Sequence, residues 1–198
     1  LKNYMEGGHN ARTFGQWDTV AEAMPDLDLL TSKPVLYLCN VDESAAVEGN
    51  EHVEALKASV ANENAEVLIL SAAIESEIAQ FDTLEERKEF LEMMGLEEPG
   101  LFRLIRKTYS LLDLITYFTA GEKEVRAWTI TKGTKAPGAA GVIHTDFEKG
   151  FIRAEVIAFD DYKALGSEAA VKEAGKMRVE GKEYVVKDGD VMHFRFNV

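Results

Sequence analysis

Two short apolar segments of the chain end in polar side chains that can bind a purine base. The first, residues 35–39, is followed by Asn40, and Glu43 stands three positions beyond it. The Glu43 carboxylate can accept two parallel hydrogen bonds from N1–H and the exocyclic amine of guanine, while the Asn40 amide can brace the loop and contact N7. The second segment ends in Ser71 and Ala72, whose hydroxyl and backbone N–H can contact the six-position of the base. The pattern predicts a purine site built from two strand ends.

Two departures from the guanine-reading pattern widen the choice of base. P-loop GTPases usually have Asn-Lys-x-Asp, whereas this chain has Val41 in place of the Lys and Glu43 in place of the Asp. No Lys stem covers the base and the longer Glu43 fits guanine less well, so adenine is also plausible. The phosphate-binding pattern G-x-x-x-x-G-K-[ST] does not occur in the sequence. A plain polar loop at Asn40 and a helix N-cap at Ser71 remain the alternatives.

The second half of the chain offers a weaker catalytic pattern and a set of cations. His144, Thr145 and Asp146 are consecutive, but a hydrolytic site also needs a nucleophile, and none is singled out. We therefore expect these residues to form a helix-to-strand turn, and we predict no catalytic residues. The four His have no ligand-like spacing to one another or to Cys39, so no metal site is predicted.

A small basic face is the other candidate in this half. Four cations flank the same loop region and can contact RNA or another partner, although solvated surface charge is the simpler interpretation. They are Lys132, Lys135, Lys149 and Arg153.

The elements that position the first site are predicted from hydrophobic periodicity. Residues 35–41 and 67–70 are continuously apolar, as expected for parallel strands buried on both faces. A helix beginning after Asn50 joins them, which makes a strand–helix–strand unit. A capping box at Thr83 starts a further helix that stops at Gly95. The last helix of this half opens at Pro99-Gly100, with its inward residues predicted to be Leu101, Leu104, Ile105 and Leu112.

Period-two patterning replaces the helical pattern after Asp113 and predicts a small α+β domain of four or five strands. Residues 167–174 are a short helix candidate, and residues 187–190 are a turn. Residues 1–24 lack sustained periodicity and are predicted to be mostly connector. The expected strands cover residues 125–130, 151–158, 182–186 and 191–198.

Charge supports a boundary near residue 113. The net charge of −13 arises entirely before that point, where 9 Lys and Arg face 22 Asp and Glu; the remainder holds 13 of each sign. The acidic half disfavours nonspecific binding of nucleic acid by the whole chain. A hydrophobic content of 46% indicates a packed protein. We expect no membrane segment or signal peptide, and the single Cys39 favours a reducing, cytoplasmic location.

Several long motifs resemble the YchF (EngD, Obg-like ATPase) family of P-loop NTPases. The resemblance runs from about Leu27 to the C-terminus, and its last two motifs are the most specific. The motifs are LTSKPVLYLCNV (30–41), SAAIE (71–75), GLEEPGL (95–101), YFTAGEKEVRAW (117–128), AAGVIHTDFEKGFIRA (139–154) and DGDVMHFRFNV (188–198).

The resemblance implies an α/β region followed by an α+β region. Residues 1–26 would be a connector from a helical insertion. Residues 27–113 would be the C-terminal part of a G domain, a partial P-loop βαβ unit. Residues 114–198 would be a TGS domain with a β-grasp, ubiquitin-like fold. The family's base-contacting residues fall on Asn40, Glu43, Ser71 and Ala72, with backbone contacts from Val41.

The resemblance also implies a function, which is that of a ribosome-associated ATPase that binds ATP or GTP with Mg²⁺ in the full-length parent. Because the phosphate loop is missing, we expect this chain to be inactive alone and to hold no cofactor firmly. Ribosomal RNA or the ribosome is the expected partner, and a monomer is the expected state. The alternatives are a nucleotide-free adaptor or RNA-binding module and, last, an enzyme with an unrecognised site in the second half.

Overall fold

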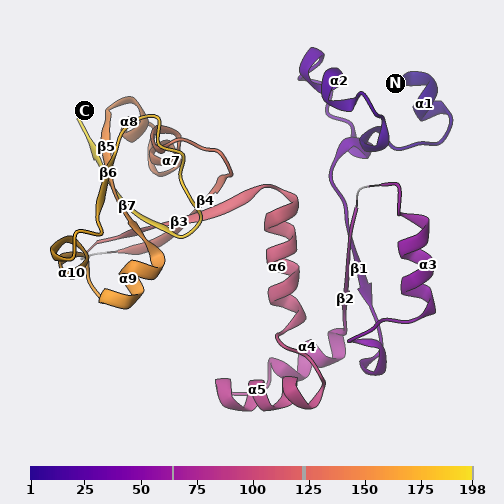
Figure 1. Ribbon diagram of the computed structural model, residues 1–198. Coiled ribbons are helices and arrows are strands. Elements are labelled where there is room, and N and C mark those ends of the chain that lie inside the picture. Colours follow the sequence, from indigo (N-terminus) through magenta and orange to yellow (C-terminus); the bar gives the residue numbers. More distant parts are fainter. Residues whose placement is uncertain (64, 122–123, 198) are drawn as a thin grey trace. The chain divides into compact units, whose positions relative to one another are not determined.

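The chain folds into two compact units, which are described separately. The computed structural model describes residues 1–63, 65–121 and 124–197. The first unit is Leu1–Leu111 and the second is Leu112–Val198 (Figure 1). Among the described residues, no helix is both long enough and apolar enough to cross a membrane.

The first unit contains a parallel pair of strands, and in the sequence helices precede, separate and follow the two strands. Strand β1 pairs with β2 in register from Leu36↔Glu66 to Asn40↔Leu70, which confirms the predicted strand–helix–strand unit. The elements are α1 (Lys2–Glu6), η1 (Ala11–Thr13), α2 (Trp17–Ala23), η2 (Leu30–Ser32), β1 (Leu36–Asn40), η3 (Glu43–Ala45), α3 (Glu51–Ser59), β2 (Glu66–Leu70), α4 (Ala72–Ile78), α5 (Leu84–Met93) and α6 (Gly100–Leu111).

The expectation that β1 is buried on both faces is wrong. Leu38, at its centre, is 46% exposed, whereas Leu68 on β2 is 3% exposed. Within the described residues the sheet of this unit has two strands. A strand of a two-stranded sheet has fewer neighbouring elements to cover its faces than a strand inside a wide parallel sheet with helices on both sides.

The predicted helix boundaries are confirmed where a side chain caps them. The Asn50 side chain accepts hydrogen bonds from the backbone N–H groups of His52 and Val53. Thr83 and Glu86 form a complete capping box. Gly95 has φ +70°, the left-handed conformation that ends helices at glycine.

The predicted inward face of α6 is wrong for three of its four residues. Leu101, Ile105 and Leu112 are 51%, 47% and 48% exposed. The helix instead turns a more polar face to β2, where Arg103 donates to the Ile69 carbonyl at 3.0 Å. Lys107 pairs with Glu66 on the same face. The periodicity of α6 correctly showed that its apolar residues share one face, but it could not show which face of the helix packs against β2.

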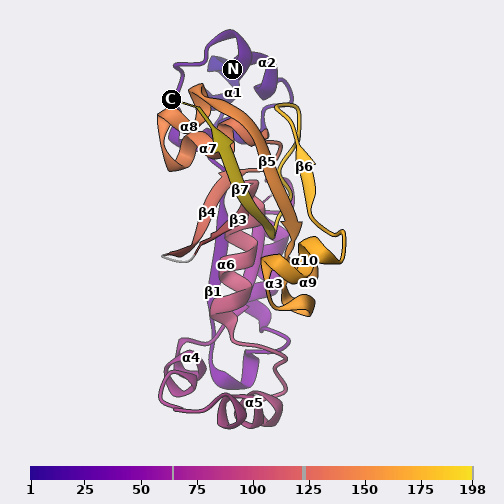
Figure 2. The ribbon, with the colours of Figure 1, turned by 90° about the vertical axis from the view of Figure 1, so that its left-hand side faces the viewer.

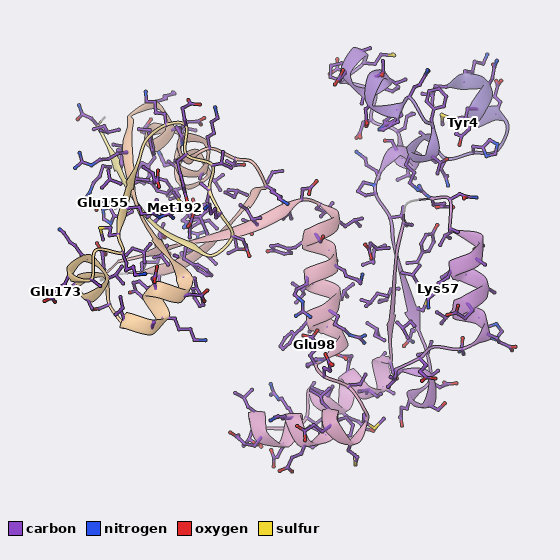
Figure 3. All side chains as sticks on the ribbon, in the orientation of Figure 1. Tyr4, Lys57, Glu98, Glu155, Glu173 and Met192 are labelled. Atoms are coloured by element: carbon purple, nitrogen blue, oxygen red, sulfur yellow. The ribbon has the colours of Figure 1, made fainter. Side chains whose placement is uncertain are left out.

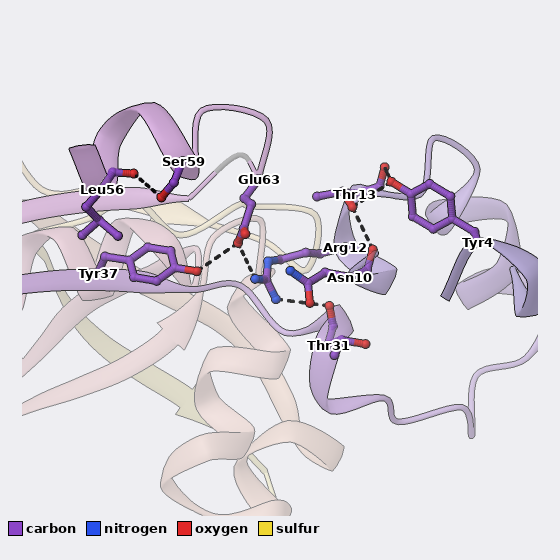
Figure 4. A network of polar contacts seen from close by, with 9 residues as sticks. All are labelled: Tyr4, Asn10, Arg12, Thr13, Thr31, Tyr37, Leu56, Ser59 and Glu63. Atoms are coloured by element: carbon purple, nitrogen blue, oxygen red, sulfur yellow. Dashed lines mark hydrogen bonds and ion pairs between the residues drawn. The ribbon is translucent and has the colours of Figure 1, made fainter. Parts of the chain in front are cut away.

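Residues 1–24, predicted to be mostly connector, contain short helices that an ion pair fastens to the sheet. Arg12 donates to Glu63 at 2.5 Å and to the Thr31 carbonyl, and Tyr37 on β1 donates to the same Glu63 (Figure 4). The Arg12 guanidinium, followed by the Tyr37 hydroxyl, lowers the pKa of the Glu63 carboxyl. The stabilisation from this contact is therefore present above the ordinary carboxyl pKa and is lost as the pH falls through the lowered value.

The second unit is built on a mixed five-stranded sheet with the order β4-β3-β7-β5-β6. Strands β3 and β4 form an antiparallel hairpin, β3 and β7 are parallel, and β5 is antiparallel to both β7 and β6. Figure 2 shows β5 and β7 side by side in the middle of this sheet. The elements are β3 (Leu114–Ala120), β4 (Val125–Thr131), α7 (Ala136–Ile143), α8 (Thr145–Lys149), β5 (Phe151–Ala158), α9 (Phe159–Leu165), α10 (Glu168–Glu173), β6 (Arg178–Glu180) and β7 (Asp190–Phe196).

An apolar core joins the sheet to α7. Tyr117 is fully buried, donates its hydroxyl to the Ala139 carbonyl at 2.9 Å and meets Phe194 edge-on. Met192, labelled in Figure 3, is 2% exposed within the same cluster. A smaller cluster around Val171 packs α10 near Ile157 and Val191. Burial raises the pKa of the Tyr117 hydroxyl, which therefore stays protonated.

The strands predicted at 125–130 and 151–158 are confirmed, as is the helix within 167–174, which Ser167 caps. The strand predicted at 191–198 is confirmed as β7, although its last residue, Val198, lies outside the described residues. The strand predicted at 182–186 is wrong, since only an isolated bridge from Lys135 to Val185 forms there. The elements that the patterning missed are β3, β6, α7, α8 and α9.

Backbone bonding explains the failure at 182–186, because the Tyr184 N–H returns to the Gly181 carbonyl in a turn and only a short pairing with residues 134–136 follows. The Tyr184 hydroxyl donates to the Asp190 carboxylate at 2.7 Å and accepts from Arg178 at 3.1 Å. Asp190 is 3% exposed and also accepts the Lys187 backbone N–H. Burial, followed by the Asp190 contact, raises the pKa of Tyr184 to about 12.

The stability of the second unit depends on a close approach at Gly150. A Cβ built on this residue would overlap the Asn197 carbonyl, whereas one built on Gly181 would meet nothing within 4 Å. We predict that Gly150→Ala lowers the free energy of unfolding by about 1–3 kcal/mol, the usual cost of overpacking. Urea unfolding followed by Trp128 fluorescence in a Trp17→Phe background measures it, with Gly181→Ala in the same background as the matched control. Equal stability of the two variants would contradict the prediction.

Candidate functional site

The carboxyl ends of β1 and β2 bring the predicted site residues together. Asn40 is the last residue of β1 and lies opposite Leu70, the last residue of β2, so Ser71 follows at the same edge. The Val41 N–H donates to the Leu70 carbonyl at 2.9 Å and extends the ladder by one bond. Ligands of open α/β sheets bind outside this edge of the strands.

A side chain ties the two loops to each other. The Asn40 side-chain oxygen accepts the Ala72 backbone N–H at 2.9 Å. Asn40 therefore braces the loop, which is one of the two roles expected of it. The same bond occupies the Ala72 N–H, which the sequence had suggested as a contact for the base. In this structure that N–H serves the loop itself.

The hydroxyl of Ser71 has no partner in the described structure. Ser71 is 3% exposed, and its Oγ is buried without a hydrogen bond. The alternative role of helix N-cap is not used, because the side chain makes no capping bond to α4. An unsatisfied buried hydroxyl costs about 1–3 kcal/mol. A ligand group that reached this oxygen would recover part of that cost.

A cleft of about 420 Å³ lies between the two loops. Four of the five predicted residues line it, and the fifth, Ala72, is replaced among the lining residues by its neighbour Ala73. Asp42 and Ser44 also line it and were missed, although they belong to the same loop as Glu43. The lining residues are Asn40, Val41, Asp42, Glu43, Ser44, Ser71 and Ala73.

The shape of the first loop follows from a short helical turn. Asp42 precedes η3, and the N–H groups of Ala45 and Ala46 return to the carbonyls of Asp42 and Glu43 at 3.0 and 3.2 Å. Ala45 and Ala46 are buried beneath the loop, while Asp42 and Glu43 are exposed at the cleft. The turn therefore holds two carboxylates at the mouth of the cleft, where each can accept hydrogen bonds from N–H donors of a ligand.

The second loop is held from the side of α6. The Glu75 carboxylate accepts the backbone N–H groups of Gly100 and Leu101 at 2.6 and 3.1 Å. These are two of the N–H groups at the start of α6 that have no partner within the helix. Glu75 thereby fixes α4, and with it the position of Ser71, against the start of α6.

The four predicted cations of the second unit come from separate elements. Lys132 follows β4, Lys135 precedes α7, Lys149 ends α8 and Arg153 lies on β5, all with exposed side chains. Lys135 is paired with Glu183 at 2.5 Å. Lys132 and Lys149 have no acidic partner within 4.0 Å among the residues that the structure describes.

The remaining candidate positions are the metal-ligating residue types and the His144–Asp146 segment. No group of three or more described His, Cys, Asp and Glu side chains is arranged to hold a metal ion. His144 caps α8 by accepting the Asp146 N–H, and it lies between two helices. The expected helix-to-strand turn is therefore wrong in form, since β5 begins only after α8.

The comparisons with known proteins agree with this architecture. A family profile named YchF-GTPase_C, described as a protein of unknown function (DUF933), matches residues 114–197. The ribosome-binding ATPase YchF of Bacillus subtilis (strain 168) is 56% identical over 100% of this chain and 54% of its own length. Obg-like ATPase 1 of Rattus norvegicus is 45% identical over 94% of this chain and 48% of its own length.

Two solved structures are also similar. The structure of the Schizosaccharomyces pombe YchF GTPase has a TM-score of 0.82 at 38% identity, over 96% of this chain and 50% of that one. A GTP binding protein from Pyrococcus horikoshii OT3 has a TM-score of 0.58 at 18% identity, which is a likeness of fold alone; the match covers 91% of this chain and 57% of that one.

A parallel strand pair with a polar cleft at its carboxyl end is the arrangement of an α/β nucleotide-binding protein. The match to YchF proteins extends over the whole chain. The chain belongs to the YchF family and spans about half the length of the curated relatives that it matches.

The geometry of the second loop makes a prediction about Glu75. We expect Glu75→Ala to lower the stability of the first unit by about 1.5–3 kcal/mol, the range for hydrogen bonds to a charged group. Amide hydrogen exchange at Gly100 and Leu101 should speed up, because both N–H groups lose their acceptor. Glu77→Ala, an exposed position on the same helix, is the control. Unchanged exchange at Gly100 would show that the contact does not persist in solution.

Proposed function

We propose that this chain supplies base recognition and partner binding within a longer, cytoplasmic YchF-type ATPase. The observation that carries the proposal is the cleft, where the ends of β1 and β2 bring Asn40, Glu43 and the unpartnered Ser71 together. The relatives named ribosome-binding ATPase YchF are about twice as long as this chain. Since the phosphate-binding motif is absent from the sequence, phosphoryl transfer would require a phosphate loop elsewhere in the parent.

Each residue of the cleft has a distinct part in the proposed recognition of ATP or GTP. Asn40 holds the two loops at a fixed separation, Glu43 accepts from the exocyclic amine or ring N–H, and Ser71 bonds the six-position of the base. Val41 adds backbone contacts, and Ala72 contributes by fixing the start of α4. In the parent, Mg²⁺ would neutralise the phosphates, which these residues do not reach.

We further propose that residues 27–113 are the C-terminal part of a G domain and that residues 1–26 connect it to a helical insertion. Residues 114–198 would be a TGS domain. The strand order supports a β-grasp assignment. If the five strands of this unit are numbered 1 to 5 along the chain, the sheet order β4-β3-β7-β5-β6 reads 2-1-5-3-4, which is the order of ubiquitin-like folds. The parallel pairing of its first and last strands, β3 and β7, supports the same assignment.

A nucleotide-free adaptor is the second candidate. It is favoured by the bond from the Ala72 N–H to Asn40, which closes the two loops on each other without a ligand. In that case the second unit alone would carry the function, through RNA or protein contacts. Nucleotide titration separates the two candidates.

The proposed base recognition makes a prediction about the choice between ATP and GTP. In a parent chain that carries a phosphate loop, Glu43→Asp combined with Val41→Lys should shift preference toward GTP by about 1–3 kcal/mol, the value of a bidentate base contact. Calorimetric dissociation constants for ATP and GTP measure the shift, with Glu48→Asp as a control outside the cleft. The isolated chain should show no turnover. An unchanged ratio of the two constants would mean that these side chains do not select the base.

The proposed partner binding makes a prediction about co-sedimentation with ribosomes. Lys132→Glu together with Lys149→Glu should reduce co-sedimentation with ribosomes, and the remaining binding should depend less steeply on salt, because each phosphate contact contributes about 0.7–0.9 to the slope. The control reverses two other exposed lysines, Lys163 on α9 and Lys172 on α10, and so makes the same change in net charge outside this set. Nucleotide affinity should be unaffected. Equal co-sedimentation of all three proteins would exclude these cations as the contact.

A further inference from the structure

The outer edge of β4 presents backbone groups that no strand of the sheet uses. Strand β4 stands at the end of the sheet, with β3 as its neighbour. The Lys132 N–H donates to the Asp113 carbonyl and the Gly121 N–H donates to the Glu124 carbonyl, which fixes the alternation of the antiparallel ladder. Even-numbered residues of β4 therefore bond to β3. The N–H and C=O groups of Val125 and Ala127 point away from it.

This edge has neither the bulge nor the proline that often prevents strand addition, and Arg126 is its one charged residue. The register of β3 and β4 continues without a bulge from Leu114↔Thr131 to Ala120↔Val125. Val125 is 74% exposed and Ala127 is exposed, and neither is charged. Proteins normally protect such edges with proline, lysine or a bulge. The opposite edge strand, β6, is only three residues long.

An apolar cleft of about 540 Å³ opens on the face beside this edge. Trp128, from β4 itself, lines it and is fixed by a hydrogen bond from its indole N–H to Thr119 at 3.0 Å. Phe147 and Phe196 stack at 3.8 Å between ring centroids on its wall, and Phe196 is 36% exposed. A side chain that extended from a strand added beside Trp128 could enter this cleft.

A positive charge lies next to the cleft. The Arg126 guanidinium stands 4.0 Å over the Trp128 ring. Its acidic neighbour, Glu124, is 4.0 Å away, and the two side chains are 54% and 69% exposed, so the pair is weak. Arg126 and Trp128 are two positions apart and therefore share one face of the strand. Together they suit a carboxylate and an apolar side chain at alternate positions of a ligand.

We propose that the β4 edge and this cleft form a docking site for an extended segment of a partner protein. The segment adds a strand to β4 and bonds to the outward backbone groups of Val125 and Ala127. One apolar side chain enters the cleft beside Trp128, and an acidic side chain two positions away pairs with Arg126. Backbone bonds of this kind give affinity, and the alternating side chains give selectivity. All the residues that form this site belong to the second unit.

The test uses the 198-residue chain and a fluorescent synthetic peptide of about nine residues, enough to span the edge strand. The peptide alternates threonine with leucine and aspartate, so that leucine and aspartate share one face. Ala127→Pro removes one outward N–H without touching the bonds to β3, and should weaken binding by about tenfold or more. Ala127→Val keeps that N–H and should bind within about twofold of the parent chain.

Two further comparisons do not depend on Ala127→Pro: one changes only the peptide, and the other reverses the charge of Arg126. Two peptides are N-methylated on alternate backbone nitrogens, one on the odd positions and one on the even positions. The peptide whose methylated nitrogens face β4 should lose binding, and the other should keep it. Arg126→Glu should weaken the aspartate peptide and strengthen one with lysine in its place. This pair of results supports the proposal even if Ala127→Pro fails to fold.

Three outcomes would overturn the proposal. The first is equal binding of both N-methylated peptides. The second is tighter binding of a single-stranded RNA of similar length that Ala127→Pro leaves unchanged, which would make the cleft a base-stacking site. The third is concentration-dependent dimerisation that Ala127→Pro abolishes while the peptide fails to bind, which would make the occupant a second copy of this chain.

Discussion

The parallel register of β1 and β2 is the constraint on which the candidate site depends. Because Asn40, the last residue of β1, lies opposite Leu70, its side chain reaches the Ala72 N–H two positions beyond the end of β2, and this bond joins the two loops. A shift of one residue would turn the Asn40 side chain to the other face of the sheet. The Glu75 contact with Gly100 and Leu101 then secures the second loop from the opposite side.

The cleft combines satisfied and unsatisfied polar groups in a way that separates support from recognition. Asn40 and Ala72 are bonded to each other and therefore maintain the shape of the loops. Glu43 is exposed at the mouth of the cleft and can meet a ligand directly, whereas the Ser71 hydroxyl is buried without a partner. A bond between a ligand and Ser71 would therefore require the surrounding loop to open, which adds to the ordering cost of binding.

In the second unit, β7 is the central strand and connects the two halves of the sheet. Strand β7 lies between β3 and β5, so the hairpin formed by β3 and β4 joins the rest of the sheet only when the end of the chain is in place. The contact between Gly150 and Asn197 shows how closely the backbones approach there. This order leaves β4 at the edge, where its outward backbone groups and the aromatic cleft lie side by side.

The sequence alone determined the features whose causes are local. The capping of α3 by Asn50 and of α5 by Thr83 depends on residues within a few positions, as does the turn at Gly95, and all three were predicted. Two apolar runs joined by a helix were enough to predict the parallel pair and the polar ends that meet at the cleft. Tertiary structure decided which face of α6 meets β2 and that the Ala72 N–H is occupied. The bonds concerned join groups more than thirty positions apart in the chain, and periodicity carries no information about them.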